Sequence, residues 1–197
     1  MNLYHRGLLL IGISTIACSS GSDTDFDAVA SSMEGIYGVS AYTRNDDACT
    51  PGGESRLRDD RFAFVARFEF FGTSLLSVTS CASVADCRNK LAMSRAGGAY
   101  AIDFGFNATS LGTDGALLGE TVNSGFADHG SCTGGEVNSS TVSLAGSALH
   151  IDVTTIRAND YPVDGRGFCS SDAAARAARG NACTKLETVS AVFLEAL

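Results

Sequence analysis

Apolar and polar residues alternate along most of this chain from Glu34 onward, and this alternation constrains the fold more than any other feature. Successive side chains of a β-strand point to opposite faces of a sheet, so the pattern predicts strands with one buried and one wet side. Strands of this kind are typical of antiparallel sheets and not of strand–helix–strand units. Eight segments show it: 34–43, 61–71, 74–80, 98–107, 115–127, 135–145, 147–157 and 184–194.

The connections between these segments fall into two alternating sets. In an up-and-down order, one set lies at one end of the sheet and consists of 44–60, 81–97, 128–134 and 158–183. The other set lies at the opposite end and is shorter, with 72–73, 108–114 and Gly146. The cysteines that follow residue 18 all fall in the first set or at its border: Cys49, Cys81, Cys87, Cys132, Cys169 and Cys183. This segregation favours an up-and-down order of the strands.

Two short helices are predicted among the longer connections. Ser83 begins the first with a capping-box pattern, and Val84, Cys87 and Leu91 then fall on one side of it. The second is predicted over 171–179, with Ser171 as the N-cap and Gly180 as the stop. Eight antiparallel strands in this order close into a barrel without unpaired edges. We therefore predict a mainly β domain, an eight-stranded antiparallel up-and-down barrel with two short helices in the loops at one end.

The first eighteen residues carry a second strong signal. A weakly basic start is followed by the apolar run 7–17, which is too short to cross a bilayer as a helix. The run ends in Thr15-Ile16-Ala17-Cys18, which resembles the lipobox of bacterial lipoproteins, with Thr15 where Leu is usual. An ordinary secretory signal with a chance cysteine is the alternative.

The resemblance to bacterial lipoproteins implies an anchor and a compartment. Residues 1–17 would be removed as a signal peptide, and Cys18 would carry several fatty acyl chains such as palmitate. Several acyl chains give durable membrane attachment where one chain is marginal. Ser19 stands where some lipoproteins have an aspartate that retains them in the inner membrane, so the resemblance implies the outer membrane of the cell envelope.

The remaining chain divides into a predicted tether and one domain. Residues 18–33 are small, polar and acidic, which predicts a flexible tether, and 34–197 form a single β domain. The chain has a formal net charge of −8. Nucleic acid is therefore not an expected partner, because phosphate binding requires a positive surface.

Six cysteines in an exported domain predict three disulfides. A metal cluster is the alternative, but the sequence has no Cys-x-x-Cys pair, which zinc sites usually contain. The pairing stays open at this stage. A bond between Cys169 and Cys183 requires the flanks of the second helix to fold back, and bonds between different loops are at least as plausible.

The first strand opens with Gly35-Ile36-Tyr37, which resembles the Gly-x-Trp that opens lipocalins, with Tyr37 in the place of Trp. The resemblance implies a barrel with an interior that either is filled or holds one small hydrophobic ligand. The residues expected to face inward and to line such a site are aromatic: Phe62, Phe64, Phe68, Phe70, Tyr100, Phe104 and Phe106.

Three polar groups are weak candidates for chemistry. Asp128-His129-Gly130-Ser131 contains an acid, a base and a hydroxyl, but neighbours in sequence rarely form a triad, and a hairpin loop is the expected structure. His150 and Asp152 share one strand face, which we expect to be solvated. Asp46 and Asp47 are a possible calcium pair. We predict no catalytic residue, no metal and no cofactor.

These patterns rank three functions. The leading expectation is a non-enzymatic envelope lipoprotein that is bound to the membrane through Cys18 and interacts with an envelope protein through its crosslinked loops. The second is a lipocalin-like carrier of a small hydrophobic ligand, and the third is an envelope hydrolase.

Overall fold

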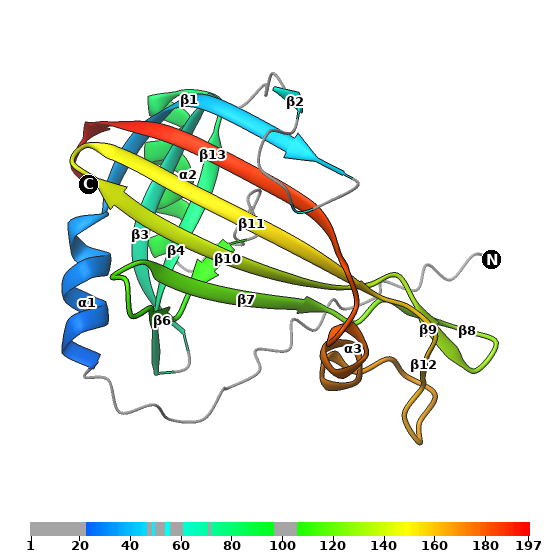
Figure 1. Cartoon of the computed structure of the whole chain (residues 1–197). Helices are drawn as coiled ribbons and strands as arrows, with labels where there is room; N and C mark the ends of the chain where they lie inside the picture. The colour runs from blue at the N-terminus through cyan, green and yellow to red at the C-terminus, as the bar shows by residue number, and fades with distance from the viewer. Residues whose placement is uncertain (1–22, 47–48, 50–53, 56–60, 71, 97–105) are drawn as a thin grey trace, which may run out of the picture.

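The computed structural model describes residues 23–46, 49, 54–55, 61–70, 72–96 and 106–197 (Figure 1). The helices among them are α1 (Asp23–Ser32), α2 (Val84–Arg95) and α3 (Ser171–Ala178). The strands are β1 (Gly35–Asn45), β2 (Glu54–Ser55), β3 (Phe62–Phe70), β4 (Thr73–Cys81), β5 (Phe106–Ala108), β6 (Ser110–Leu111), β7 (Leu117–Asn123), β8 (Phe126–Asp128), β9 (Ser131–Thr133), β10 (Gly135–Ala145), β11 (Ala148–Ala158), β12 (Tyr161–Pro162) and β13 (Cys183–Glu195).

The prediction of a mainly β, antiparallel fold is confirmed. One large sheet follows the order β5-β4-β3-β1-β13-β11-β10-β7-β6, with β2 paired to the side of β1, and every pairing is antiparallel. The two ends of this path, β5 and β6, are neighbours in the chain and are separated by Thr109 alone. The sheet therefore curls into a nearly closed barrel (Figure 1).

The path has nine strands, whereas the sequence analysis predicted eight. The difference arises at Thr109, where the chain stops pairing with β4 and starts pairing with β7. The Thr109 amide donates a hydrogen bond of 2.9 Å to the carbonyl of Leu118 in β7. The additional strand, β6, lies within 108–114, which was predicted to be a connection. Of the predicted strand 98–107, the structure describes residues 106 and 107, in β5.

Apolar side chains from the large sheet and from α1 form one continuous core inside the curled sheet. Small and branched residues dominate it, and its largest fully buried members include Tyr37, Leu76 and Leu149. Burial of this apolar surface is the main favourable term in folding. The members of this interior core are Phe26, Ala30, Met33, Tyr37, Tyr42, Ala63, Val65, Leu76, Val78, Ala108, Leu117, Val142, Leu149, Ile151, Val189 and Ala191.

The predicted tether over 18–33 needs a correction, because ten of its residues form helix α1. Phe26, Ala30 and Met33 recur at the helical spacing of four and three residues, and all three are buried in the interior core. The hydroxyl of Tyr37 donates a 2.8 Å hydrogen bond to the carbonyl of Met33 and so joins the end of α1 to β1. Of the predicted tether, residues 18–22 lie outside the described chain.

Strand β3 is buried on both faces, which corrects the expected inward orientation of its phenylalanines. Ala63 and Val65 face the interior core, whereas Phe64 and Ala66 pack on the other side of the sheet beneath α2. Phe62 and Phe68 border this second cluster. The run is apolar at nearly every position, as is typical of a doubly buried strand, and the smaller side chains occupy the curled inner side.

Helix α2 confirms the predicted start and face. Ser83 is its N-cap, and the hydroxyl of Ser83 accepts a 3.1 Å hydrogen bond from the amide of Asp86. The Asp86 carboxylate accepts in return from the amide of Ala82, at 2.9 Å. Cys87 and Leu91 are buried against the sheet.

The cap gives a first testable prediction. The Ser83→Ala variant leaves the amide of Asp86 without its acceptor and should lower the free energy of unfolding by about 1 kcal/mol. Urea unfolding measures the loss. Ser74→Ala, at an exposed position of β4, is the control and should change stability by less than about 0.5 kcal/mol. Equal losses in the two variants would rule out a capping role.

Candidate interaction surface

A second, small sheet stands beside one end of the barrel and carries the candidate site. Its order is β12-β9-β8, and in Figure 1 it lies with α3 on the side opposite α1. Strands β8 and β9 form a hairpin whose turn is His129-Gly130, with positive φ angles of 48° and 84°. The sequence Asp128–Ser131 is thus a hairpin loop, as predicted.

A disulfide fastens this sheet to the loop that leads into α3. Cys132 of β9 bonds to Cys169, with their α-carbons 5.8 Å apart. The buried Cys132, Ala158 and Tyr161 pack against Ala174 and Ala178 of α3 in a separate small core. Alanine side chains let the helix approach the strands closely, so these loops form a packed unit on the end of the barrel.

Two glycines permit the close packing of this unit. Gly125 has φ of 66°, and a β-carbon there would lie 2.1 Å from the carbonyl oxygen of Thr133. A β-carbon at Gly135 would meet the hydroxyl of Tyr161 at 2.9 Å. That hydroxyl instead donates a hydrogen bond to the carbonyl of Ser124. Burial raises the pKa of Tyr161, so the hydroxyl keeps its proton.

Helix α3 starts at Ser171, the first residue of the predicted range, but its N-cap lies one residue earlier than predicted. Its N-cap is Ser170 and not Ser171, and the hydroxyl of Ser170 accepts a 3.2 Å hydrogen bond from the amide of Ala173. Gly180 follows the helix with φ of 89°, in agreement with its predicted role as the stop.

A tight turn before α3 is organised by Asp164. Its Oδ1 accepts hydrogen bonds of 2.9 Å from the amides of Arg166 and Phe168. The amide of Asp164 donates to the carbonyl of Phe168 at 2.8 Å and closes the turn. The hydrogen bonds from Phe168 and Arg166 lower the pKa of Asp164, because they stabilise the charged carboxylate.

This turn should open in acid. Because the folded-state pKa of Asp164 lies below the ordinary value of 3.8, its contribution is complete above that value and is lost as the pH falls through the lowered pKa. Hydrogen exchange of the Phe168 amide should therefore lose protection below about pH 4. In Asp164→Ala the protection should be absent at neutral pH, whereas Asp152→Ala should retain it. Unchanged protection in Asp164→Ala would contradict the role given to this carboxylate.

Two phenylalanines project from this unit into solvent. Phe126 of β8 is 64% exposed and Phe168 of the turn is 67% exposed. Ala127, next to Phe126, pairs with Cys132, and Phe168 precedes Cys169, so one disulfide lies beside both. Exposed aromatic residues on a rigid support are the usual anchors of protein interfaces. The sequence analysis did not single them out, although both follow glycines in cysteine-bearing loops.

The other cysteines are also paired. Cys49 bonds to Cys183 and Cys81 to Cys87, with α-carbons 5.5 and 5.2 Å apart. The expectation of three disulfides is confirmed, and Cys169 and Cys183 have different partners. By chain order, all six cysteines lie in or beside the connections that follow β1, β4, β7 and β11. The prediction that they share one end of the sheet is wrong for Cys81–Cys87, because Arg88 of α2 contacts Glu195 near the C-terminus at 2.6 Å.

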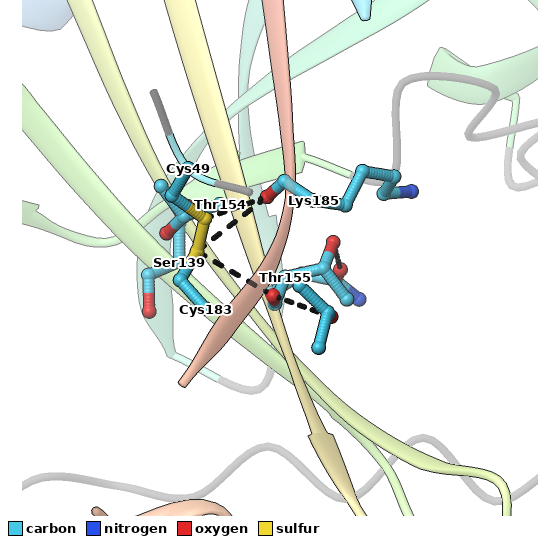
Figure 2. Close-up of a disulfide and its surroundings, with 8 residues drawn as sticks. Cys49, Ser139, Thr154, Thr155, Cys183 and Lys185 are labelled. Atoms are coloured by element: carbon cyan, nitrogen blue, oxygen red, sulfur yellow. Dashed lines mark hydrogen bonds between the residues drawn. A yellow bond between two sulfur atoms is a disulfide. The ribbon is translucent and has the colours of Figure 1, made fainter. Parts of the chain in front are cut away.

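Figure 2 shows how the Cys49–Cys183 bond meets the barrel wall. Cys49 Sγ lies 3.1 Å from the carbonyl oxygen of Lys185, and Cys183 Sγ lies 3.6 Å from that of Thr155. The side chain of Lys185 extends away from the disulfide. The bond thus ties the segment after β1 to the start of β13, across a large separation in sequence.

The inner face of the barrel is charged toward this disulfide end. Glu187 shares a strand face with Val189 of the interior core; it accepts a 2.7 Å hydrogen bond from Lys185 and another from the hydroxyl of Tyr42. Burial alone would raise the pKa of Glu187, but these hydrogen bonds and the positive charges of Lys185 and Arg44 outweigh burial and lower the pKa. The sequence analysis had expected an apolar inner face.

Of the seven residues expected to line a ligand site, the three with described side chains pack on the side of the sheet away from the interior core. Phe62, Phe64 and Phe68 belong to the cluster beneath α2. Phe70 and Phe106 belong to β3 and β5, but the structure describes only their backbone. Tyr100 and Phe104 fall outside the described residues.

His150 and Asp152 do approach each other, on the outer face of β11. Nε2 of His150 is 3.4 Å from Oδ2 of Asp152, and its Nδ1 is 3.3 Å from Oγ of Ser190 in β13. All three sit on paired strands, with half-exposed imidazole and carboxylate. Oγ1 of Thr188 donates a 2.8 Å hydrogen bond to Oδ1 of Asp152, so the group forms a polar network on the outside of the sheet.

Metal and membrane-spanning features were sought in the described residues. They contain no cluster of three or more His, Cys, Asp or Glu side chains suited to a metal ion. Asp47, one member of the possible calcium pair, lies outside this part of the chain. None of the described helices has the length and hydrophobicity required to traverse a bilayer. Comparison with protein-family models, curated proteins and solved structures found no match.

Proposed function

We propose that this chain is a lipid-anchored lipoprotein of the bacterial cell envelope that binds a partner protein through its disulfide-linked loops and catalyses no reaction. The lipobox-like Thr15–Cys18 supports export and acylation at Cys18. The three disulfides are compatible with an oxidising compartment outside the cytoplasm.

One observation carries the interaction part of this proposal: two exposed phenylalanines stand on a preorganised support. Phe126 and Phe168 are held by a hairpin, a closed turn and the Cys132–Cys169 bond. Little conformational entropy remains to be lost when such side chains enter a partner's pocket, and this favours affinity. Large exposed apolar groups on a rigid surface otherwise carry a cost in solubility.

The placement of the anchor fits this use of the loops. Residue 18 lies five positions before α1, and α1 leads into the start of β1. The β8–β9 hairpin and the loop before α3, which carry Phe126 and Phe168, follow the other ends of β7 and β11. Strands β10 and β11 each have 11 residues and span about 36 Å. An anchored molecule thus presents Phe126 and Phe168 well above the lipid surface.

Site-specific photocrosslinking tests the proposal in the bacterium that makes the protein. A photoreactive phenylalanine is placed at Phe126 or Phe168, and at the exposed Met93 of α2 as a matched control. We expect both loop positions to form an adduct of one common mass, and Met93 to form none. The adduct should disappear in Cys132→Ser/Cys169→Ser. Adducts of equal yield at all three positions, or at none, would contradict a specific interface.

The finer architecture is also part of the proposal. If β5 and β6 are counted as one strand interrupted at Thr109, eight strands follow one another up and down around the barrel, as in lipocalins. A role as carrier of a small hydrophobic ligand has less support. The interior core is continuous from α1 through Tyr37 to Ile151, and the inner face near Glu187 is charged.

A further inference from the structure

Exposed apolar side chains gather at the C-terminus, on the side of the molecule opposite β8, β9 and α3 (Figure 1). Val192, Phe193, Leu194 and Leu197 are between 39% and 49% exposed. They are half of the large hydrophobic side chains exposed in the described part of the chain; the others are Met93, Leu118, Phe126 and Phe168. We refer to residues 192–197 as the C-terminal apolar segment. Exposed apolar side chains that are concentrated in one segment indicate a contact with a partner or a membrane.

This segment lies where α1 joins the sheet. Glu195 pairs with Ile36 at the start of β1, and a β-carbon at Gly35 would lie 2.6 Å from the ring of Phe193. The amide of Phe193 donates a 2.9 Å hydrogen bond to the carbonyl of Ser147, in the turn between β10 and β11. Figure 1 shows the C-terminus next to α1 and away from β8, β9 and α3.

The proposed acylation site can lie only a short distance from this end. The five peptide units from Cys18 to Asp23 span at most about 18 Å. Helix α1, with 10 residues, is about 15 Å long. A lipid surface that holds the acyl chains of Cys18 is therefore within reach of the end of the barrel that carries the C-terminal apolar segment.

The charges around the segment are compatible with a lipid surface. Glu195 forms an ion pair with Arg88 of α2 at 2.6 Å. Arg67 pairs with Glu34 at 3.2 Å and lies 3.7 Å from Asp27 of α1. Two arginines thus offset most of the charge of three carboxylates, which reduces their repulsion of anionic lipid headgroups.

We propose that the C-terminal apolar segment inserts into the outer part of the lipid bilayer and forms a second membrane contact beside the acylated Cys18. The inference rests on the proposed lipid anchor. Apolar side chains that enter the boundary of headgroups and acyl chains add binding in proportion to their buried area. Two contacts, one through Cys18 and one on the barrel, fix the orientation of the domain. The β8–β9 hairpin and the turn that holds Phe168 then point away from the membrane.

Tryptophan fluorescence tests this inference, because the chain contains no tryptophan of its own. The full chain is purified with its acyl groups as Leu194→Trp, and as Phe168→Trp for a matched exposed position at the opposite end. Each variant is reconstituted into phosphatidylcholine vesicles with or without bromine on the acyl chains. Bromine should quench Leu194→Trp at least about twofold, as expected for a side chain 5–10 Å into the interface, and should leave Phe168→Trp unchanged.

The outcomes separate this inference from the proposed anchor. If Leu194→Trp co-floats with the vesicles in a density gradient but its fluorescence is not quenched, the proposed anchor stands and the proposed insertion of the segment is wrong. If neither variant floats and neither carries acyl chains, the anchor and the inference both fail. Val192→Trp provides a second reporter on the same exposed segment if Leu194→Trp misfolds. Absence of quenching together with a dimer in solution would assign the segment to a second copy of the chain instead.

Discussion

Removing the Cys49–Cys183 disulfide with the Cys49→Ser/Cys183→Ser variant is expected to lower the free energy of unfolding by about 5 kcal/mol. The two cysteines are separated by 134 residues, so their bond restricts the unfolded chain more than the other two disulfides do. The same chain-entropy relation gives about 4 kcal/mol for Cys132–Cys169, across 37 residues, and about 2 kcal/mol for Cys81–Cys87, across 6.

Urea unfolding of the three double variants measures this order. Cys81 of β4 and Cys87 of α2 are fully buried between the helix and the sheet, so they are replaced by alanine to avoid burying new polar groups. The Cys81→Ala/Cys87→Ala variant is the control with the shortest closed loop. A larger loss for this control than for Cys49→Ser/Cys183→Ser would contradict an account in which the long-range bond supplies most of the crosslinking stability.

The Phe26→Ala variant should lower the free energy of unfolding by about 3 kcal/mol. Phe26 is 8% exposed and packs with Ala30 and Met33 in the interior core, so its removal leaves a cavity between α1 and the sheet. Ser31→Ala, at an exposed position of the same helix, should change stability by less than about 0.5 kcal/mol. Both values come from urea unfolding at neutral pH.

A small and equal effect of Phe26→Ala and Ser31→Ala would mean that α1 is a tether, as its sequence first indicated. The distinction matters for orientation. A docked α1 leaves only residues 18–22 between the proposed acylated Cys18 and the folded domain. A free segment over 18–33 would let the barrel tumble at a distance from the lipid, and would separate the C-terminal apolar segment from the bilayer.

The strands were predictable because their burial follows a period of two. Along β11, Leu149 and Ile151 face the core, whereas His150 between them is exposed. The alternation fixes which residues share a face, but it does not say which face is inside. For β3 that choice was reversed, because Ala63 and Val65 proved to face the interior and α2 covers the larger Phe64.

Features that depend on tertiary contacts were missed or stayed open. The pairing of Cys132 with Cys169 depends on how the small sheet meets the loop before α3, and sequence spacing carries no record of it. The described buried side chains of this segment are Phe26 and Ala30 of α1 and Met33 directly after it, and most of the residues between them are small or polar. The break at Thr109 depends on the barrel wall, where the chain changes its partner strand from β4 to β7.

The candidate interaction surface was predicted only by region. The cysteines indicated the loops near β9 and α3, but Phe126 stood at the end of the predicted strand 115–127 and Phe168 in a predicted loop, so neither was singled out. Their exposure depends on local backbone conformation: the positive φ of Gly125 before β8, and the turn in which Asp164 accepts a hydrogen bond from the amide of Phe168. Asp164, three residues before Gly167, was a readable sequence signal for that turn.

The intact mass of the protein extracted from the membrane of its own bacterium tests the arrangement of anchor and loops most directly. The predicted mass is that of residues 18–197 with acyl chains on Cys18, with all six domain cysteines oxidised and none labelled by a thiol reagent before reduction. A chain that retains residues 1–17, a Cys18 without acyl groups, or labelled domain thiols would contradict it.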